Sequence, residues 1–218
     1  MKNLDRRNKY FFGLGTIGRD MFYAFEANAL LYFLSNILSL PIHVFAAVSL
    51  VLSVLRIADA LNDPITGLVI DNIHTKWGKF KPWILSGTIV SSVLLVVLFT
   101  GIFGLAEKNW ILFAVLFVIL FVILDVFYSF SDVSYWGMVP ALSEDSDERG
   151  VYTALGNFTG SIGWNGLTII VVPIVTWFTF VATGKHTEGP QGWVAFSVII
   201  AALTIICMTI TAFGTQEK

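Results

Sequence analysis

Six long apolar stretches follow one another along this chain of 218 residues, and they constrain its fold more than any other feature. Each stretch is near or above the roughly 20 residues that an α-helix needs to cross a lipid bilayer. Because the connecting segments are short, we expect neighbouring spans to run antiparallel in one bundle over residues 1–218. The six predicted membrane-spanning helices are at about 10–37, 42–72, 82–105, 110–138, 150–181 and 191–213.

The composition supports an all-α membrane protein. Hydrophobic residues make up 56% of the chain and charged residues only 13%, against about 25% charged residues in an average soluble domain. A water-soluble chain of this length could not cover its surface with so few polar residues. No basic stripe with interleaved aromatic residues is present, so we expect membrane lipid and no nucleic acid as a partner. The single cysteine, Cys207, cannot form an intramolecular disulfide, and nothing in the sequence indicates a cofactor.

The distribution of lysine and arginine predicts the orientation, because cytoplasmic loops carry an excess of these residues. One predicted side holds nine of the 13 basic residues and the other side holds two, while Arg19 and Arg56 lie inside spans. Both termini are therefore expected in the cytoplasm, in a multi-pass protein of the cytoplasmic (inner) membrane. The nine residues are Lys2, Arg6, Arg7, Lys9, Lys76, Lys79, Lys81, Arg149 and Lys218; the other two are Lys108 and Lys185.

Two carboxylates, Asp59 and Asp63, lie inside the second predicted span. At helical spacing, positions four apart point to the same side. A charge inside the hydrocarbon layer is costly and is a functional candidate by default. Two carboxylates on one helical face therefore indicate a site for a cation or a proton.

Polar residues of three spans can converge near the middle of the bilayer. Arg19 and Asp20 belong to the first span, and Asp125, Ser129 and Asp132 share one face of the fourth span. Together with the second span they predict a polar cavity between helices, which is where transporters bind substrates and coupling ions.

Two kinds of chemistry are available in such a cavity. Carboxylate, amide and hydroxyl oxygens are hard ligands suited to Na⁺, Li⁺ or H⁺, and close carboxylates can also hold a proton. We therefore predict a cation site formed by Asp59, Asn62, Asp63 and Ser129, with Asp59 and Asp63 as the carboxylate ligands of Na⁺ or Li⁺. Sugar recognition needs carboxylates for hydroxyl groups and an aromatic face for the ring, which Asp20, Asp132 and Trp136 offer, with Arg19 and Tyr128 as supporting donors.

The segments 59–67 (DALNDPITG), 76–83 (KWGKFKPW) and 129–136 (SFSDVSYW) resemble the signature of the glycoside–pentoside–hexuronide:cation symporters, whose best-known member is melibiose permease. The resemblance covers the whole chain, but only the N-terminal half of the family's architecture. It implies a six-helix bundle of a major-facilitator fold, which in the whole family has twelve helices in two bundles that exchange access by rocking. It also implies cation-coupled sugar symport.

Matching residues imply the same roles. Asp59, Asn62 and Asp63 match the family's cation site, and Ser129 stands where melibiose permease has threonine. Asp20 and Asp132 match the carboxylates that hold the sugar, Arg19 matches a basic partner, and Tyr128 and Trp136 match neighbouring aromatic residues. Asn157 stands where the family's best-known member has an arginine near the sugar, and Glu26 and Asp125 are additions relative to it.

Three alternatives accompany this prediction. Asp59 and Asp63 could form structural ion pairs with Arg56 and Arg19. The chain could be a truncated half without transport activity, or one that needs the missing C-terminal half or a second six-helix half. An enzyme with an aspartate cluster and Mg²⁺ is the competing class, but Pro64 to Gly67 follows Asn62 and Asp63 without a further carboxylate. We therefore expect a transporter and no enzyme.

Overall fold

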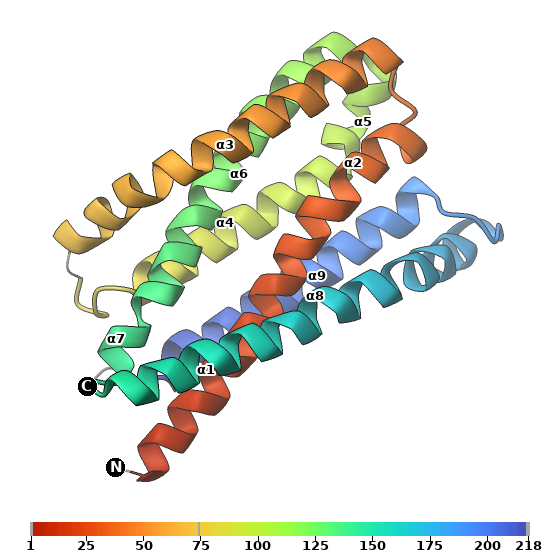
Figure 1. Cartoon of the computed structure of the whole chain (residues 1–218). Helices are drawn as coiled ribbons and strands as arrows, with labels where there is room; N and C mark the ends of the chain where they lie inside the picture. The colour runs from red at the N-terminus through yellow and green to blue at the C-terminus, as the bar shows by residue number, and fades with distance from the viewer. Residues whose placement is uncertain (1, 74, 217–218) are drawn as a thin grey trace.

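Helices form the whole architecture in the part of the chain that the structure, a computed structural model, describes (Figure 1). That part comprises residues 2–73 and 75–216, without the side chains of residues 2–5 and 58–61. The helices are α1 (Lys2–Ala24), α2 (Leu30–Tyr32), α3 (Ile42–Asn72), α4 (Lys81–Phe99), α5 (Gly101–Lys108), α6 (Trp110–Gly137), α7 (Val139–Leu142), α8 (Ser146–Thr183) and α9 (Pro190–Gly214). This agrees with the predicted all-α fold class.

Local sequence signals explain where several helices begin and end. The side chain of Asn109 accepts a hydrogen bond from the backbone N–H of Leu112 at the start of α6, and Asp145 does the same for Asp147 at the start of α8. These side-chain oxygens satisfy backbone donors that have no partner within the helix. Gly184 ends α8 in the left-handed conformation, at φ +74°. Pro190 occupies the first turn of α9, where its missing N–H is tolerated.

The first helix does not stay a regular α-helix. After α1, the chain makes two π-helical segments, η1 (Phe25–Ala29) and η2 (Phe33–Ile37), with α2 between them. Extra residues in such turns shift the side chains that follow around the helix axis. Regular helical spacing therefore predicts the direction of the side chains of α1 up to Ala24, but not of the residues that follow.

Four helical stretches are long and apolar enough to cross a membrane, and the two parts of α3, Ile42–Ile57 and Asn62–Asn72, make a fifth when taken together. The four are Lys81–Lys108, Trp110–Leu142, Ser146–Thr183 and Pro190–Gly214. The first of the six predicted spans does not qualify by this measure. The reason is that α1 contains Arg19 and Asp20 in addition to the basic residues at its start. Among the described residues, apolar length thus identifies up to five spans, not six.

The helices pack as one bundle. The helix α1 packs against α8 and α9, α4 packs against α6 and α9, and α3 lies along α6 at the edge of the bundle (Figure 1). The two ends of the chain lie at the same end of the bundle. There Arg7 donates a hydrogen bond of 3.0 Å to the carbonyl of Gly214, and Asn8 exchanges hydrogen bonds with the backbone of Gln216.

Two apolar clusters form the core and leave a polar layer between them. One contains Phe12, Tyr135 and Met138, near the chain ends. The other contains Phe22, Phe25 and many further aromatic residues toward the opposite end. On α1, Arg19 and Asp20 lie between the two clusters, and on α6 the same is true of Asp132. The fold therefore places Arg19 and Asp20 of α1 and Asp132 of α6 at one level of the bundle.

Candidate functional site

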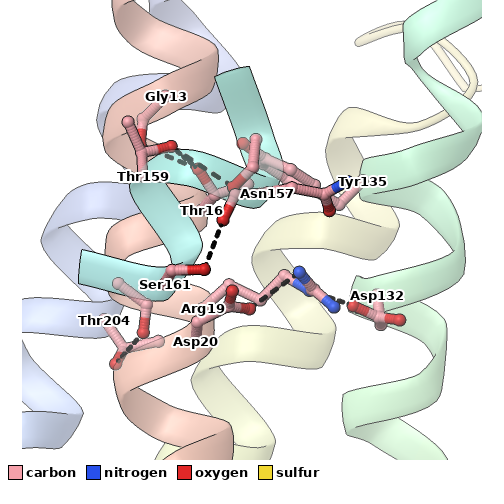
Figure 2. A network of polar contacts seen from close by, with 12 residues as sticks. Gly13, Thr16, Arg19, Asp20, Asp132, Tyr135, Asn157, Thr159, Ser161 and Thr204 are labelled. Carbon is pink, nitrogen blue, oxygen red and sulfur yellow. Dashed lines mark hydrogen bonds and ion pairs between the residues drawn. The ribbon is translucent and has the colours of Figure 1, made fainter. Parts of the chain in front are cut away.

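Arg19 is the centre of an ion-pair network between α1 and α6. Its Nη1 donates a hydrogen bond of 2.8 Å to Oδ1 of Asp20, and its Nε donates to Oδ1 of Asp132 (Figure 2). Its guanidinium carbon also lies 5.2 Å from the centre of the Trp136 ring, which is a cation–π contact. One cation thus joins two carboxylates and one aromatic ring, all four of which were predicted to bind sugar.

The helix α8 packs against Asp20, one of the carboxylates of this network. Asp20 lies directly against Gly160, where a side-chain Cβ would come within 1.9 Å of Oδ2 of Asp20. One turn before Asp20 on α1, the hydroxyl group of Thr16 shares a hydrogen bond of 2.5 Å with that of Thr159 on α8 (Figure 2). Close approach at a glycine is what allows the Asp20 carboxylate to fit between α1 and α8.

A cavity of about 220 Å³ opens beside the network. Residues of α1, α3 and α6 line it: Arg19, Tyr23, Asp63, Asp125, Tyr128, Ser129 and Asp132. With all side chains in their usual ionisation states, this lining carries one positive and three negative charges. The cavity thus combines donors and acceptors for hydroxyl groups with an excess of negative charge.

Asp63 and Ser129 meet at this cavity, although 66 positions separate them in sequence. The hydroxyl group of Ser129 on α6 donates a hydrogen bond of 2.8 Å to Oδ1 of Asp63 on α3. The structure therefore brings together two of the four residues predicted for the cation site. Asn62 lies half-buried on α3, and Asp59 falls outside the residues whose side chains are described. Within the described part of the chain, no group of three or more His, Cys, Asp and Glu side chains could hold a metal ion.

The arginines do not pair with Asp63 in the described part of the structure. Arg19 is engaged by Asp20 and Asp132, and Nη2 of Arg56 donates to Oε1 of Glu26 at 3.2 Å. Glu26 is buried, with 6% of its surface exposed. The alternative of a structural ion pair between Asp63 and an arginine is therefore wrong for this conformation, and Glu26 is the partner that the sequence analysis did not assign.

Tyr128 contributes to the cavity in a different way from Trp136. Its ring stacks nearly parallel with those of Phe22 and Tyr23, at centroid distances of 5.2 and 5.7 Å. Its hydroxyl oxygen is buried and has no hydrogen-bond partner among the described residues. A buried hydroxyl group without a partner costs free energy.

Two cavity residues were given no role in the cation or sugar site from the sequence. Tyr23 lies one helical turn after Arg19, and this spacing is the signal that could have found it. Asp125 lies one turn before Ser129 on α6 and had been left without a role. In contrast, Asn157, at the position of the family's arginine, is exposed on α8 and does not line this cavity.

Comparison with known proteins identifies related sequences. The model of the MFS/sugar transport protein family matches residues 11–218. The chain is 53% identical over 213 residues to the lactose permease of Leuconostoc lactis and 55% identical over 213 residues to that of Lactobacillus helveticus, and each alignment covers 95% of this chain and 33% of the relative. The raffinose carrier protein of Pediococcus pentosaceus is 34% identical over 212 residues, covering 94% of this chain and 33% of the relative.

This chain therefore spans about a third of the length of these relatives. All three are named permeases or carriers, which supports the transporter class over the competing enzyme class. The match over residues 11–218 also confirms the family resemblance noted from the sequence motifs. Together with the apolar helices, it makes this a multi-pass protein of the cell membrane that belongs to the MFS/sugar transport protein family of the major facilitator type.

Proposed function

We propose that the cavity between α1, α3 and α6 is the N-terminal part of the binding site of a cation-coupled sugar symporter that works by alternating access. The observation that carries this proposal is the meeting of two arrangements at one cavity. The Arg19–Asp132 ion pair and the Asp63–Ser129 hydrogen bond both line it. A sugar and a cation bound there would be neighbours.

The sugar would bind at the Arg19 network. Carboxylate oxygens of Asp20 and Asp132 accept hydrogen bonds from sugar hydroxyl groups, and the guanidinium group of Arg19 donates to them. Trp136 does not line the cavity, but its ring contacts Arg19 and would offer an apolar surface to a pyranose bound at this network. The names of the relatives, lactose permease and raffinose carrier protein, support galactose-containing sugars as the first candidates.

The cation would bind at Asp63 and Ser129, with Asp59 and Asn62 as further candidate ligands. The excess of negative charge along the cavity favours a cation there, because opposite charges attract. In the structure the Ser129 hydroxyl group donates to Asp63. A bound Na⁺ or Li⁺ would instead accept a lone pair from that hydroxyl oxygen, so the hydroxyl group would turn.

The two sites would be coupled through α6. Ser129 and Asp132 are three residues apart and lie on the same face of that helix. A shift of α6 that improves the contacts of Ser129 with a cation therefore moves Asp132 relative to Arg19. In this way the cation would change the affinity for sugar, and by linkage the sugar would change the affinity for the cation by the same factor.

A further segment of protein is expected to complete the cavity. The relatives are about three times as long as this chain. We therefore propose that a second six-helix half packs against this bundle during transport.

Uptake into cells that lack galactoside transport tests the proposal. The chain is expressed alone, and together with the part of the Leuconostoc lactis lactose permease that lies beyond the matched region. Labelled lactose and raffinose are supplied with sodium, lithium or choline chloride, and at two external pH values. We expect uptake that depends on one of these cations or on the proton gradient when both segments are present. Absence of uptake in both preparations refutes transport activity, and equal uptake under all ionic conditions refutes the coupling.

A further inference from the structure

An open cavity of about 540 Å³ lies between α1 and α8, apart from the proposed sugar and cation site. We call it the α1–α8 groove. Arg6 and Lys9, near the start of α1, line one end of it. The rest of the lining is mainly apolar and includes Leu14, Ile17, Val151 and Leu155. The groove is therefore basic at one end and apolar over most of its surface.

The basic end of the groove lies toward the end of the bundle that holds the chain ends. The helices α1 and α8 run in the same direction, because Lys9 contacts Tyr152 and Asp20 contacts Gly160 farther along both helices (Figure 1). From Lys9 to Ile17, α1 advances by eight residues, or roughly 12 Å. The distribution of lysine and arginine predicts that this end of the bundle faces the cytoplasm. On that orientation the basic end meets the headgroup layer, and the apolar part extends into the hydrocarbon layer.

The two basic side chains have no anionic partner in the described part of the chain. Neither Arg6 nor Lys9 forms an ion pair there. The Lys9 ammonium group lies 5.8 Å from the centre of the Tyr152 ring, a cation–π contact that holds it between α1 and α8. No described carboxylate lines the groove, and Asp147, one turn before Val151 on α8, is exposed outside the lining. Two positive charges therefore remain at this end to attract an anion.

The groove faces away from the cavity between α1, α3 and α6. The helix α1 is regular up to Ala24, so successive side chains are about 100° apart around its axis. Leu14 and Ile17 therefore point about 140° and about 160° away from Arg19, which lines that cavity. A second half that closes the cavity would cover the side of α1 that bears Arg19 and leave the groove to the surrounding lipid.

We infer that the α1–α8 groove binds one anionic phospholipid of the leaflet that contains the chain ends. Arg6 and Lys9 hold its phosphate group through charge-assisted hydrogen bonds, and one of its acyl chains lies along Leu14, Ile17 and Leu155. Basic pockets between membrane helices on the cytoplasmic side suit anionic headgroups. A zwitterionic phospholipid has the same chains but carries a positive charge of its own, so it binds more weakly.

Lipid binding to the purified chain in a neutral detergent tests this site. Fluorescent phosphatidylglycerol is the probe, and the competitors are unlabelled phosphatidylglycerol, phosphatidylcholine with the same acyl chains, and glycerol phosphate, which has no acyl chains. We expect phosphatidylglycerol to compete at least tenfold better than phosphatidylcholine, and glycerol phosphate not to compete. Arg6→Gln and Lys9→Gln should each weaken binding about fivefold, or about 1 kcal/mol for one basic residue near an anionic lipid.

Control variants separate the groove from the rest of the surface. Lys76→Gln removes a basic residue that does not line the groove and should bind phosphatidylglycerol normally. Val151→Trp fills the groove without changing a charge and should weaken binding at least tenfold. Ile162→Trp is its matched control, because Ile162 is also on α8 and is 50% exposed, against 49% for Val151, but does not line the groove.

Several results would overturn the lipid site. Equal competition by the two phospholipids, or equal losses in Lys9→Gln and Lys76→Gln, would leave no anion-specific groove. Competition by glycerol phosphate as strong as that by phosphatidylglycerol would leave a phosphate site without a role for the acyl chain. Loss of the probe on co-purification with the C-terminal part of the Leuconostoc lactis lactose permease would make the groove a contact with the second half. If a charge variant fails to elute as a single species, Val151→Trp against Ile162→Trp decides.

Discussion

Gly160→Ala on α8 is a perturbation that reaches the sugar site without changing any polar residue. A Cβ at this position would lie 1.9 Å from Oδ2 and 2.9 Å from Cγ of Asp20. The closer contact is 1.5 Å short of the 3.4 Å at which ordinary van der Waals contact begins. The carboxylate of Asp20 must therefore move away from α8, or α1 and α8 must separate.

We expect a movement of that size to break the hydrogen bond that Nη1 of Arg19 donates to Oδ1 of Asp20. The bond is 2.8 Å long, and an extension of more than an ångström takes it beyond the range of a hydrogen bond. A hydrogen bond between the Asp20 carboxylate and a sugar hydroxyl group would contribute about 1.5–3 kcal/mol, which corresponds to about 10–100-fold in affinity. We expect Gly160→Ala to weaken lactose binding by about tenfold or more, because Asp20 no longer presents its oxygens to the sugar.

Two other glycines of α8 provide the controls. A Cβ on Gly166 meets nothing within 4 Å, so Gly166→Ala should bind lactose normally and, since alanine favours helices, should be at least as stable as the unmodified chain. A Cβ on Gly163 comes within 2.4 Å of the backbone oxygen of Ile17. Because backbone atoms cannot rotate away, Gly163→Ala should lower the melting temperature.

The assay is lactose binding in membranes, combined with thermal melting of the solubilised protein. We expect Gly160→Ala to bind lactose more weakly than the unmodified chain but to melt at a higher temperature than Gly163→Ala. Lactose affinity in Gly160→Ala equal to that in Gly166→Ala would refute the role of Asp20. A melting temperature as low as that of Gly163→Ala would show that the helices, and not the carboxylate, had moved.

Three further predictions concern other parts of the structure. Asp63→Asn should abolish the cation dependence of lactose binding while Asp20→Asn weakens lactose binding at every cation concentration; titrations with NaCl and LiCl separate the two effects, and identical behaviour of both variants would contradict separate sites. Arg56→Met should lower the free energy of unfolding, measured by denaturant titration, by up to about 3 kcal/mol, because it leaves the buried carboxylate of Glu26 without its arginine. Adding Glu26→Gln should restore much of that loss. A double variant less stable than Arg56→Met would exclude this explanation. Gly104→Ala should cost about 1 kcal/mol, because Gly104 has φ +77° and a Cβ destabilises the left-handed conformation; melting that matches the unmodified chain would refute strain at this turn.

Regular helical spacing was sufficient to predict which side chains of the site share a face when they lie on one helix. Asp125, Ser129 and Asp132 were expected to share one face of the fourth span, and in the structure all three line one cavity. The spacing holds there because α6 is an uninterrupted helix from Trp110 to Gly137. In the first span it holds for Arg19 but not beyond Ala24, where two π-helical segments change the direction of the side chains that follow.

Contacts between helices depend on how the helices pack, so the spacing of residues along one helix could not predict them. Nothing in the sequence indicates that Glu26 would meet Arg56, that Gly160 would support Asp20, or that Trp164 would lie against Tyr23. Each of these contacts joins residues at least 30 positions apart. A helical pattern defines which way a side chain points from its own axis, but not which helix stands opposite.

The sequence by itself determined that this protein is a helical membrane protein of the sugar transport family and that charged residues lie within its spans. It did so because the length of an apolar stretch and the cost of a charge in hydrocarbon are properties of single segments. Only the tertiary structure decided that Arg19 bridges Asp20 and Asp132, and that Ser129 rather than an arginine contacts Asp63. Those choices depend on how α1, α3 and α6 approach one another, because a buried charge takes the partner that packing brings within a few ångströms.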